Sequence, residues 1–225
     1  MIGFEIRTRE RAVSKETVDK FRGIPVANIS DCMSRMTAGG AQLRPMHDGC
    51  PLAGPALTVR TRPGDNLLVH KALDLAQPGD VIVVDAGGDL SNAIIGEIMT
   101  SYAQSRGIAG ILINGAIRDS GAIRQGSFPV YAAGVTHRGP YKDGPGEINC
   151  VIAFNGMTIA PGDLILGDED GLLSIPFEQT EALYLAASSK HELETKMLSD
   201  IAAGSLDTSW VDARLNLLGC AGAQT

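Results

Sequence analysis

The 225-residue sequence has few of the residues that build metal–thiolate sites or disulfide frameworks. Its four cysteines, Cys32, Cys50, Cys150 and Cys220, form no CxxC pair and lie in no cluster with histidine. This spacing argues against a zinc site and against a disulfide scaffold, so we expect reduced and buried thiols. A nucleophilic Cys32 would also need a neighbouring base, and the sequence identifies none.

Runs of positive charge and phosphate-binding glycine loops are missing as well. The formal net charge is −7, and no Lys/Arg-rich run or basic patch with interleaved aromatic residues occurs. Direct binding to nucleic acid is therefore not expected, although an acidic protein can bind another protein. The pairs Gly39-Gly40 and Gly87-Gly88 fit neither the GxGxxG nor the GxxxxGKS/T spacing, and no glycine loop for S-adenosylmethionine is visible.

Long hydrophobic runs are the third absence. No apolar stretch reaches the roughly 18 residues that span a bilayer, and the segment from Met1 to Arg11 is too charged for a secretory signal peptide. We therefore expect no membrane partner and a cytoplasmic location. With 44% hydrophobic residues, the chain can still bury one substantial core, and a single domain is expected.

One stretch predicts a strand–helix–strand unit. Val81–Asp85 (VIVVD) is a β-branched apolar run, as in a buried strand, and Ile108–Asn114 (IAGILIN) is a second one. Between them, Glu97–Arg106 has apolar residues at helical spacing and stops before Gly107. Such a unit is a right-handed parallel crossover, in which the helix begins and the second strand ends at the same ligand-binding edge of the sheet.

The start of the predicted helix offers groups that can bind an anion. Gly96 is the expected N-cap, and the backbone N–H groups of Glu97, Ile98 and Met99 precede the first intrahelical acceptor. A helix N-terminus of this kind suits an anionic oxygen. We therefore predict that Gly96, Ile98 and Met99 contact the substrate.

Arg118 and Asp119 should lie at the same edge, just past the second strand. Arg118 offers a planar, permanently charged fork for a carboxylate or keto oxygen. Asp119 and Glu97 are hard oxygen ligands that suit Mg²⁺ or Mn²⁺. The alternative is structural, because an Arg-Asp pair is often a solvated surface pair and an acid in a first helical turn often interacts only with the helix dipole.

The segment Gly134–Asn149 is predicted to be a long loop. It is rich in Gly and Pro and carries His137, Arg138 and Lys142. It is longer than a simple connector, and long loops often have functional roles. Two alternatives are open: one of these cations binds a distal carboxylate of a substrate, or the loop packs against a neighbouring subunit.

The remaining pattern alternates short strands and helices, which indicates an α/β protein. We expect three or four short strands within Val151–Ser174, with Asp168, Glu169 and Asp170 as structural turn residues. Helices are expected at Ser14–Phe21, Ser30–Met36, Asn66–Ala76 and Thr180–Ala203, and further strands at Ala56–Thr61 and Pro129–Ala132.

Several of these motifs resemble those of one family. The chain is similar to the class II pyruvate aldolases that cleave 4-hydroxy-4-methyl-2-oxoglutarate and 4-carboxy-4-hydroxy-2-oxoadipate, a family shared with the RraA-type regulators of ribonuclease E. Glu97 keeps the family's spacing to the Arg-Asp pair. The similar segments are Gly54–Val59 (GPALTV), Pro78–Asp85 (PGDVIVVD), Gly96-Glu97, Gly115–Asp119 (GAIRD), Pro161–Asp163 (PGD) and Gly167–Gly171 (GDEDG), within a stretch from Ile29 to Gly204.

The resemblance implies a fold and an assembly. The fold would be an α/β/β/α sandwich of the swivelling phosphohistidine-domain type, with residues 1–225 as a single RraA-like domain. This domain would carry N-terminal helices within residues 14–36 and a C-terminal helical extension within residues 177–225. The assembly would be a homotrimer or homohexamer.

The resemblance also implies a metal-dependent aldol cleavage of the kind used in the degradation of aromatic compounds. A 4-hydroxy-2-oxo acid would yield pyruvate and a second product, pyruvate or oxaloacetate, with Mg²⁺ or Mn²⁺ on Asp119 and Glu97 and with Arg118 stabilising the enolate. Oxaloacetate decarboxylase activity would accompany it. Where the family often has a further acid this chain has Ala122, which leaves the outer shell of the metal and the substrate open. The alternative function is a non-catalytic regulator of ribonuclease E.

A glutamate of the C-terminal helix is the last site residue that the resemblance implies. In the family, such a residue reaches the active site of an adjacent subunit, and Glu194 is the matching position, with Glu192 as the fallback. Glu194 or Glu97 would orient the water that accepts the proton of the C4 hydroxyl group. The alternative is a solvated helix glutamate beside Lys190 and Lys196.

Overall fold

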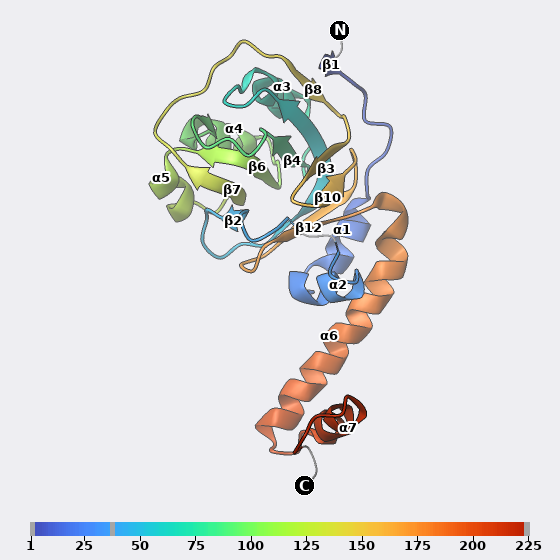
Figure 1. Ribbon diagram of the computed structural model, residues 1–225. Coiled ribbons are helices and arrows are strands. Elements are labelled where there is room, and N and C mark those ends of the chain that lie inside the picture. Colours follow the sequence, from blue (N-terminus) through green and yellow to red (C-terminus); the bar gives the residue numbers. More distant parts are fainter. Residues whose placement is uncertain (1–2, 37–38, 223–225) are drawn as a thin grey trace. The chain divides into compact units, whose positions relative to one another are not determined.

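The computed structural model of the protein describes residues 3–36 and 39–222 (Figure 1). It divides into two compact units, Met1–Ala187 and Ser188–Thr225, and helix α6 (Thr180–Ala202) runs from the first into the second. The helices of the first unit are α1 (Lys15–Phe21), α2 (Val26–Cys32), α3 (Leu67–Leu75), α4 (Glu97–Ser105), α5 (Ser120–Gln125) and the 3-10 helix η1 (Phe177–Gln179). Its strands are β1 (Phe4–Ile6), β2 (Arg44–Pro45), β3 (Leu52–Thr61), β4 (Val81–Asp85), β5 (Ala93–Ile95), β6 (Gly110–Ile117), β7 (Val130–Val135), β8 (Gly146–Ile148), β9 (Ile152–Phe154), β10 (Met157–Ile159), β11 (Leu164–Gly167) and β12 (Leu172–Ile175).

The main sheet has the strand order β1-β8-β3-β4-β6-β7-β2. Its centre is parallel, because β3 pairs with β4, β4 with β6, and β6 with β7 in parallel register. β11 leaves this layer by pairing antiparallel with both β3 and β12, and β9 forms a separate hairpin with β10. The β4–α4–β6 segment is therefore the parallel crossover that the sequence predicts.

Three apolar clusters separate four layers. β4 shows why its apolar run is continuous: Ile82 and Val84 belong to the cluster beneath α3 and α4, whereas Val81 and Val83 face the cluster that includes β9 and β10. Successive residues of a strand point to opposite faces, so a strand covered on both sides is apolar throughout. The third cluster joins β11 and β12 to α1, α2 and the start of α6. The order of layers is α/β/β/α, and the predicted fold is confirmed (Figure 1).

The elements around the predicted site agree closely with the sequence pattern. β4 has the predicted bounds, and α4 begins at Glu97 with Gly96 as its N-cap. β6 ends at Ile117, three residues beyond the predicted strand, because its last residues pair with both β5 and β7. β5 itself lies in a segment that the sequence assigns to a connection.

Two other expectations are wrong. The helix expected at Ser30–Met36 is α2, which starts four residues earlier, after Pro25, and ends before Ser34 and Arg35, both of which have a φ of 58°. The loop expected at Gly134–Asn149 contains β8, which pairs with β1 and β3. In both places the deciding contacts come from distant segments, such as the bond from the Val26 N–H group to Asp168 Oδ2 (2.8 Å).

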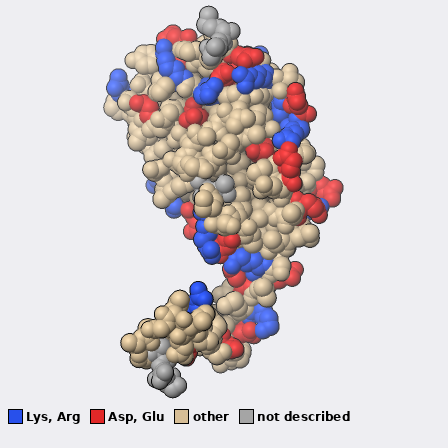
Figure 2. All heavy atoms as spheres, turned by 45° about the vertical axis from the view of Figure 1, so that its right-hand side comes forward, with Lys and Arg blue, Asp and Glu red and all other residues tan. Residues whose placement is uncertain are grey.

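The expectation of buried thiols is wrong for three of the four cysteines. All four cysteines are free, but only Cys150 is buried, while Cys32 and Cys50 are half-buried and Cys220 is exposed. On the face shown in Figure 2, basic and acidic side chains are interspersed and form no continuous basic area. Within residues 3–36 and 39–222, no helix is both long and apolar enough to cross a membrane.

The second unit consists of the later part of α6 and the helix α7 (Ser209–Leu217). The predicted end of α6 is confirmed within a residue, and Gly204 follows it with a φ of 67°. α7 was not expected, since it buries no residue and lacks a clear apolar face. Exposed apolar residues along this part of α6 include Leu193, Met197, Leu198 and Ile201.

Candidate active site

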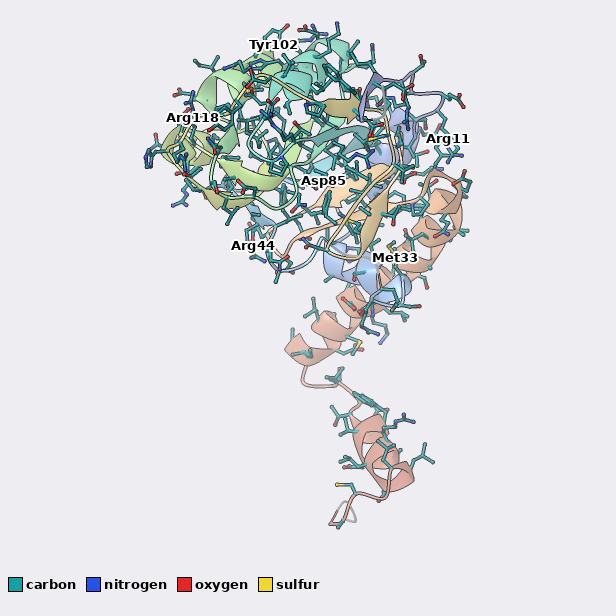
Figure 3. The ribbon with its side chains drawn as sticks, turned by 45° about the horizontal axis from the view of Figure 1, so that its top comes forward. Arg11, Met33, Arg44, Asp85, Tyr102 and Arg118 are labelled. Atoms are coloured by element: carbon teal, nitrogen blue, oxygen red, sulfur yellow. The ribbon has the colours of Figure 1, made fainter. Side chains whose placement is uncertain are left out.

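Arg118 and Asp119 lie where β6 ends, at the edge of the sheet where α4 begins (Figure 3). The Arg118 N–H group donates to the carbonyl oxygen of Ile95 in β5 (3.0 Å), which fixes the backbone of the pair. The Arg118 side chain is 43% exposed, and its Nε lies 3.7 Å from Asp119 Oδ2. The guanidinium group is thus held beside a carboxylate and remains accessible.

Asp119 joins the two segments that the sequence predicts to converge. Its Oδ2 accepts a hydrogen bond from the backbone N–H group of Glu97 (3.0 Å), the first residue of α4. Its own backbone is left-handed, with φ 56° and ψ 34°, at the N-cap position of α5. A non-glycine residue in this region is strained, and such strain often marks functional sites. The predicted meeting of Glu97 with Arg118 and Asp119 is therefore confirmed for the backbone of Glu97, whose side chain is exposed.

Gly96 allows this close approach. Its φ of −153° is extended backbone that any residue adopts, so space, and not conformation, requires glycine here. A Cβ atom at this position would collide with Asp119 Oδ2 and would lie 2.9 Å from Arg118 Cγ. The Gly96-Glu97 dipeptide is thus the packing partner of the Arg118-Asp119 pair.

The structure revises the predicted anion-binding role of the helix start. The N–H group of Glu97 already binds Asp119, and the N–H group of Met99 donates to the Gly96 carbonyl oxygen (3.1 Å). Ile98 is the second residue of α4, so its N–H group precedes the first intrahelical acceptor. Ile98 is therefore the best placed of the three N–H groups to meet a ligand, and substrate contact by Gly96, Ile98 and Met99 stays a prediction.

A cavity of about 140 Å³ opens beside Arg118. Ile94, Ile95, Ile98 and Met99 form apolar parts of its wall. Its polar lining residues are Asn66, His70, Arg118 and Lys142. Since this volume is below the roughly 300 to 1,000 Å³ of sites for drug-sized ligands, the cavity suits a small polar molecule.

His70 faces this cavity as a neutral side chain. Burial of part of the ring lowers its pKa from the ordinary value, and the nearby charge of Lys142 lowers it further, while Asp74 has the opposite effect. The neutral imidazole is therefore favoured at neutral pH. His70 supplies hydrogen-bonding capacity without a second positive charge next to Lys142.

A larger cavity of about 240 Å³ lies elsewhere, beside Tyr131. Two of its polar side chains have protein partners: His47 uses both ring nitrogens on backbone groups of Val130 and Cys50, and Tyr131 donates to the Asp168 carbonyl oxygen (2.9 Å). His47 and Tyr131 therefore serve the packing around β7, and this cavity lies apart from the edge where β6 ends and α4 begins.

The residues at the sheet edge fit a hard divalent cation only in part. Among the residues that the structure describes, no group of three or more His, Cys, Asp or Glu side chains could hold a metal ion. The Glu97 N–H group uses one of the roughly four acceptor positions of the Asp119 carboxylate. Mg²⁺ is commonly held by one or two carboxylates, with water and substrate oxygens completing its shell. Asp119 and Glu97 fit that arrangement and do not form a three-ligand centre within one chain.

Sequence reasoning did not assign Asn66 and His70 to the site, and it left Lys142 as one of three alternatives. Asn66 occupies the N-cap position of α3 and donates from Nδ2 to the Ile94 carbonyl oxygen (2.9 Å), while His70 follows one turn later. A signal was available, because residues four apart on a helix share a face. Glu194 lies on α6 in the second unit, where it pairs with Lys190 (3.1 Å), and its catalytic role stays a prediction.

Replacing Gly96 by alanine tests the packing at this edge. We expect Gly96→Ala to move the Asp119 carboxylate away from the Glu97 N–H group and to lower kcat/KM about 10- to 100-fold, because misplacement by about 1 Å can cost that much. Gly121→Ala in α5 is the matched control, since a Cβ there meets nothing within 4 Å. Equal kinetic constants for the two variants would show that Gly96 is not needed at the site.

The family model described as RraA-like, Aldolase/RraA, matches residues 26–173. The chain belongs to the RraA-like family. The matched region contains the whole β4–α4–β6 unit with Gly96, Arg118 and Asp119. The family resemblance drawn from the sequence motifs is confirmed.

Individual relatives agree with this assignment. A protein of Halalkalibacterium halodurans, provisionally named 4-hydroxy-4-methyl-2-oxoglutarate aldolase, is 41% identical over 186 residues, which cover 81% of this RraA-like chain and 89% of the relative. The structure of the RNA-processing inhibitor RraA from Thermus thermophilis has 32% identity and a TM-score of 0.63, covering 68% of this chain and 92% of that one. An uncharacterized protein from Pseudomonas syringae pv. tomato has a TM-score of 0.77 at 23% identity, covers 86% of this chain and 96% of that one, and supports the fold alone.

Proposed function

We propose that this RraA-like protein is a divalent-metal-dependent aldolase, a lyase that cleaves a 4-hydroxy-2-oxo acid to pyruvate and a second carbonyl product. The observation that carries the proposal is the convergence of Asp119 with the start of α4 and the exposed Arg118 guanidinium group, the last two of which also line one small cavity. The relative from H. halodurans, named for 4-hydroxy-4-methyl-2-oxoglutarate, supports that compound as a substrate. 4-Carboxy-4-hydroxy-2-oxoadipate is the second candidate.

The reaction requires stabilisation of a negative charge on the substrate. Removal of the C4 hydroxyl proton allows the C3–C4 bond to break, and its electron pair moves to the C2 oxygen as the pyruvate enolate forms. Arg118 binds the C1 carboxylate and the C2 oxygen, and its charge is worth most when the enolate develops. A proton then returns to C3, and pyruvate leaves.

Two carboxylates of this edge complete the proposed site. Glu97 is exposed at the first turn of α4, where its side chain orients the water that accepts the C4 hydroxyl proton. Asp119 and Glu97 would hold Mg²⁺ or Mn²⁺, which supplies Lewis-acid stabilisation of the same developing charge. Decarboxylation of oxaloacetate passes through the same enolate, so we expect it as a second activity.

The rival function is binding to ribonuclease E without catalysis. It is favoured by the likeness to the RNA-processing inhibitor from T. thermophilis. A pure binding module, however, has no chemical need for a strained Asp119 beside Arg118 and opposite the start of α4. The retained acid therefore favours catalysis.

Pyruvate release from a panel of acids tests the proposal. The panel contains 4-hydroxy-4-methyl-2-oxoglutarate, 4-carboxy-4-hydroxy-2-oxoadipate and oxaloacetate, each assayed with Mg²⁺ by coupling to lactate dehydrogenase. We expect release from oxaloacetate and from at least one hydroxy acid. Absence of release from every member, together with direct binding to ribonuclease E, would favour the regulator.

A further expectation is that Glu194 acts on the site of an adjacent subunit of a homotrimer or homohexamer. Asp119→Ala and Glu194→Ala are each expected to be inactive, because each removes one carboxylate of the shared site. Mixing the two under conditions of subunit exchange should restore part of the activity, since some interfaces then have both residues intact. If mass spectrometry shows exchange and no activity returns, Glu194 is a scaffold residue.

A further inference from the structure

We infer that Lys142 determines substrate specificity by binding the distal carboxylate of the substrate, the one at the end opposite the 2-oxo acid group. The inference rests on the proposed function and deepens it. It decides among the three cations of the Gly134–Asn149 segment.

Two cations are among the residues that line the cavity beside Arg118, and Asp119 pairs with one of them, Arg118, from outside the lining (3.7 Å). Arg118 and Lys142 both line it, and no Asp or Glu is among its lining residues, although the chain has 26 acidic and 19 basic residues. Two separate cations suit an acid with two carboxylates, one for each.

The backbone on both sides of Lys142 is held by buried groups. The Tyr141 N–H group donates to the Gly64 carbonyl oxygen (2.8 Å), and the Tyr141 carbonyl oxygen accepts from the Asn66 N–H group (3.0 Å). Asp65 Oδ2 accepts from the N–H groups of Asp143 (2.7 Å) and Gly144 (2.9 Å). Lys142 is thus presented by a fixed segment, although its own side chain is exposed.

Asp65 fixes this segment relative to the rest of the cavity. Its carboxylate is fully buried, is paired with Arg62 (3.1 Å), and accepts through Oδ1 from the N–H group of Leu67 (2.9 Å). Leu67 is the first residue of α3, the helix that carries His70 into the cavity. One buried carboxylate therefore holds both the backbone next to Lys142 and the start of the helix that carries His70. A lysine that only contacts solvent would not need its backbone to be held in this way.

The other two cations of the segment are placed differently. Neither His137 nor Arg138 lines the cavity, and the carbonyl oxygen of Arg138 accepts from the Ala93 N–H group (2.8 Å). The next residue, Gly139, lies close to Arg118, with 3.3 Å between a Cβ built at this glycine and Arg118 Nη1. The segment thus passes over Arg118 before it presents Lys142.

The remaining wall matches the middle of such a substrate. Ile94, Ile98 and Met99 line the same cavity and can contact a methyl or methylene group. The neutral His70 can share a hydrogen bond with a carboxylate or hydroxyl oxygen beside Lys142. Arg118 then binds the 2-oxo acid end and Lys142 the distal carboxylate.

The test compares two substrates that differ only in the distal carboxylate. These are 4-hydroxy-4-methyl-2-oxoglutarate and 4-hydroxy-4-methyl-2-oxopentanoate, which yield pyruvate plus pyruvate and pyruvate plus acetone. For Lys142→Met, we expect kcat/KM to fall about 10- to 100-fold for the dicarboxylate, mainly through KM, because a hydrogen bond to a charged group is lost. For the monocarboxylate we expect a change below about threefold, since that substrate never makes the contact.

Two further variants control the result. Lys142→Arg keeps the charge and should retain most of the preference for the dicarboxylate. Lys71→Met removes an exposed lysine of the same helix as His70 that does not line the cavity, and it should leave both substrates unaffected. Circular dichroism should show the same thermal unfolding for all variants.

The outcomes separate the two proposals. Equal losses on both substrates, or no loss on either, would overturn the role of Lys142 and leave the aldolase function standing. If the wild-type protein shows no preference for the dicarboxylate, the role of Lys142 is likewise overturned and the aldolase function still stands. No pyruvate from either substrate with the wild-type protein would overturn both.

Discussion

Pyruvate release is expected to stop in excess EDTA and to return when Mg²⁺ or Mn²⁺ is added. The acidic side chains predicted to hold the ion, Asp119 and Glu97, offer carboxylate oxygens, which suit hard divalent cations. A Lewis acid at the enolate oxygen is worth several kcal/mol, so the loss should be on the order of 10³-fold. The measurement is the initial rate of pyruvate formation after chelation and after titration with each metal.

The fold should survive chelation. Asp119 is already held by the Glu97 N–H group, and the three apolar clusters lie between layers that need no ion. Unchanged circular dichroism in EDTA would separate loss of chemistry from loss of structure. Full turnover in EDTA, or borohydride trapping of a substrate–lysine adduct, would contradict the metal-dependent mechanism.

Arg118→Lys is expected to lower kcat by on the order of 10²-fold or more, as removal of one oxyanion donor does. Lysine keeps one positive charge but loses the planar fork that contacts the carboxylate and the enolate oxygen together. The backbone bond from the Arg118 N–H group to Ile95 does not depend on the side chain, so the fold should be unaffected. Steady-state kinetics with oxaloacetate and a hydroxy acid provide the measurement.

A second arginine near the same edge gives the matched control. Arg124 is exposed in the last turn of α5, and Arg124→Lys should change neither kcat nor KM. Both variants should unfold within about 0.5 kcal/mol of the wild type, as surface substitutions usually do. Near-native kinetics for Arg118→Lys would make Arg118 a structural residue.

Local sequence determined the centre of the candidate site. β4 and α4 were predictable because an apolar run, a glycine before the helix and a glycine after it act over a few residues. The topology rule for parallel crossovers then placed Glu97 near Arg118 and Asp119. The contact between the Glu97 N–H group and Asp119 agrees with that reasoning.

Local sequence failed where pairing between distant segments decides the structure. β5 and β8 are three-residue strands, too short for a pattern, and each exists because a longer strand pairs with it. α2 begins earlier than its apparent cap because Asp168, far along the chain, binds the N–H group of Val26. These are contacts of tertiary structure, and propensity does not contain them.

By itself, the sequence determined the α/β class, the family and the edge that carries Gly96, Arg118 and Asp119, because these depend on periodicity and on short motifs. Only the tertiary structure decided which cation of the Gly134–Asn149 segment lies on the cavity. That choice depends on Asp65, which binds the backbone of Asp143, 78 residues later in the chain. A buried carboxylate needs hydrogen-bond donors. For Asp65 these include the backbone N–H groups of Asp143 and Gly144, which directly follow Lys142 in the chain.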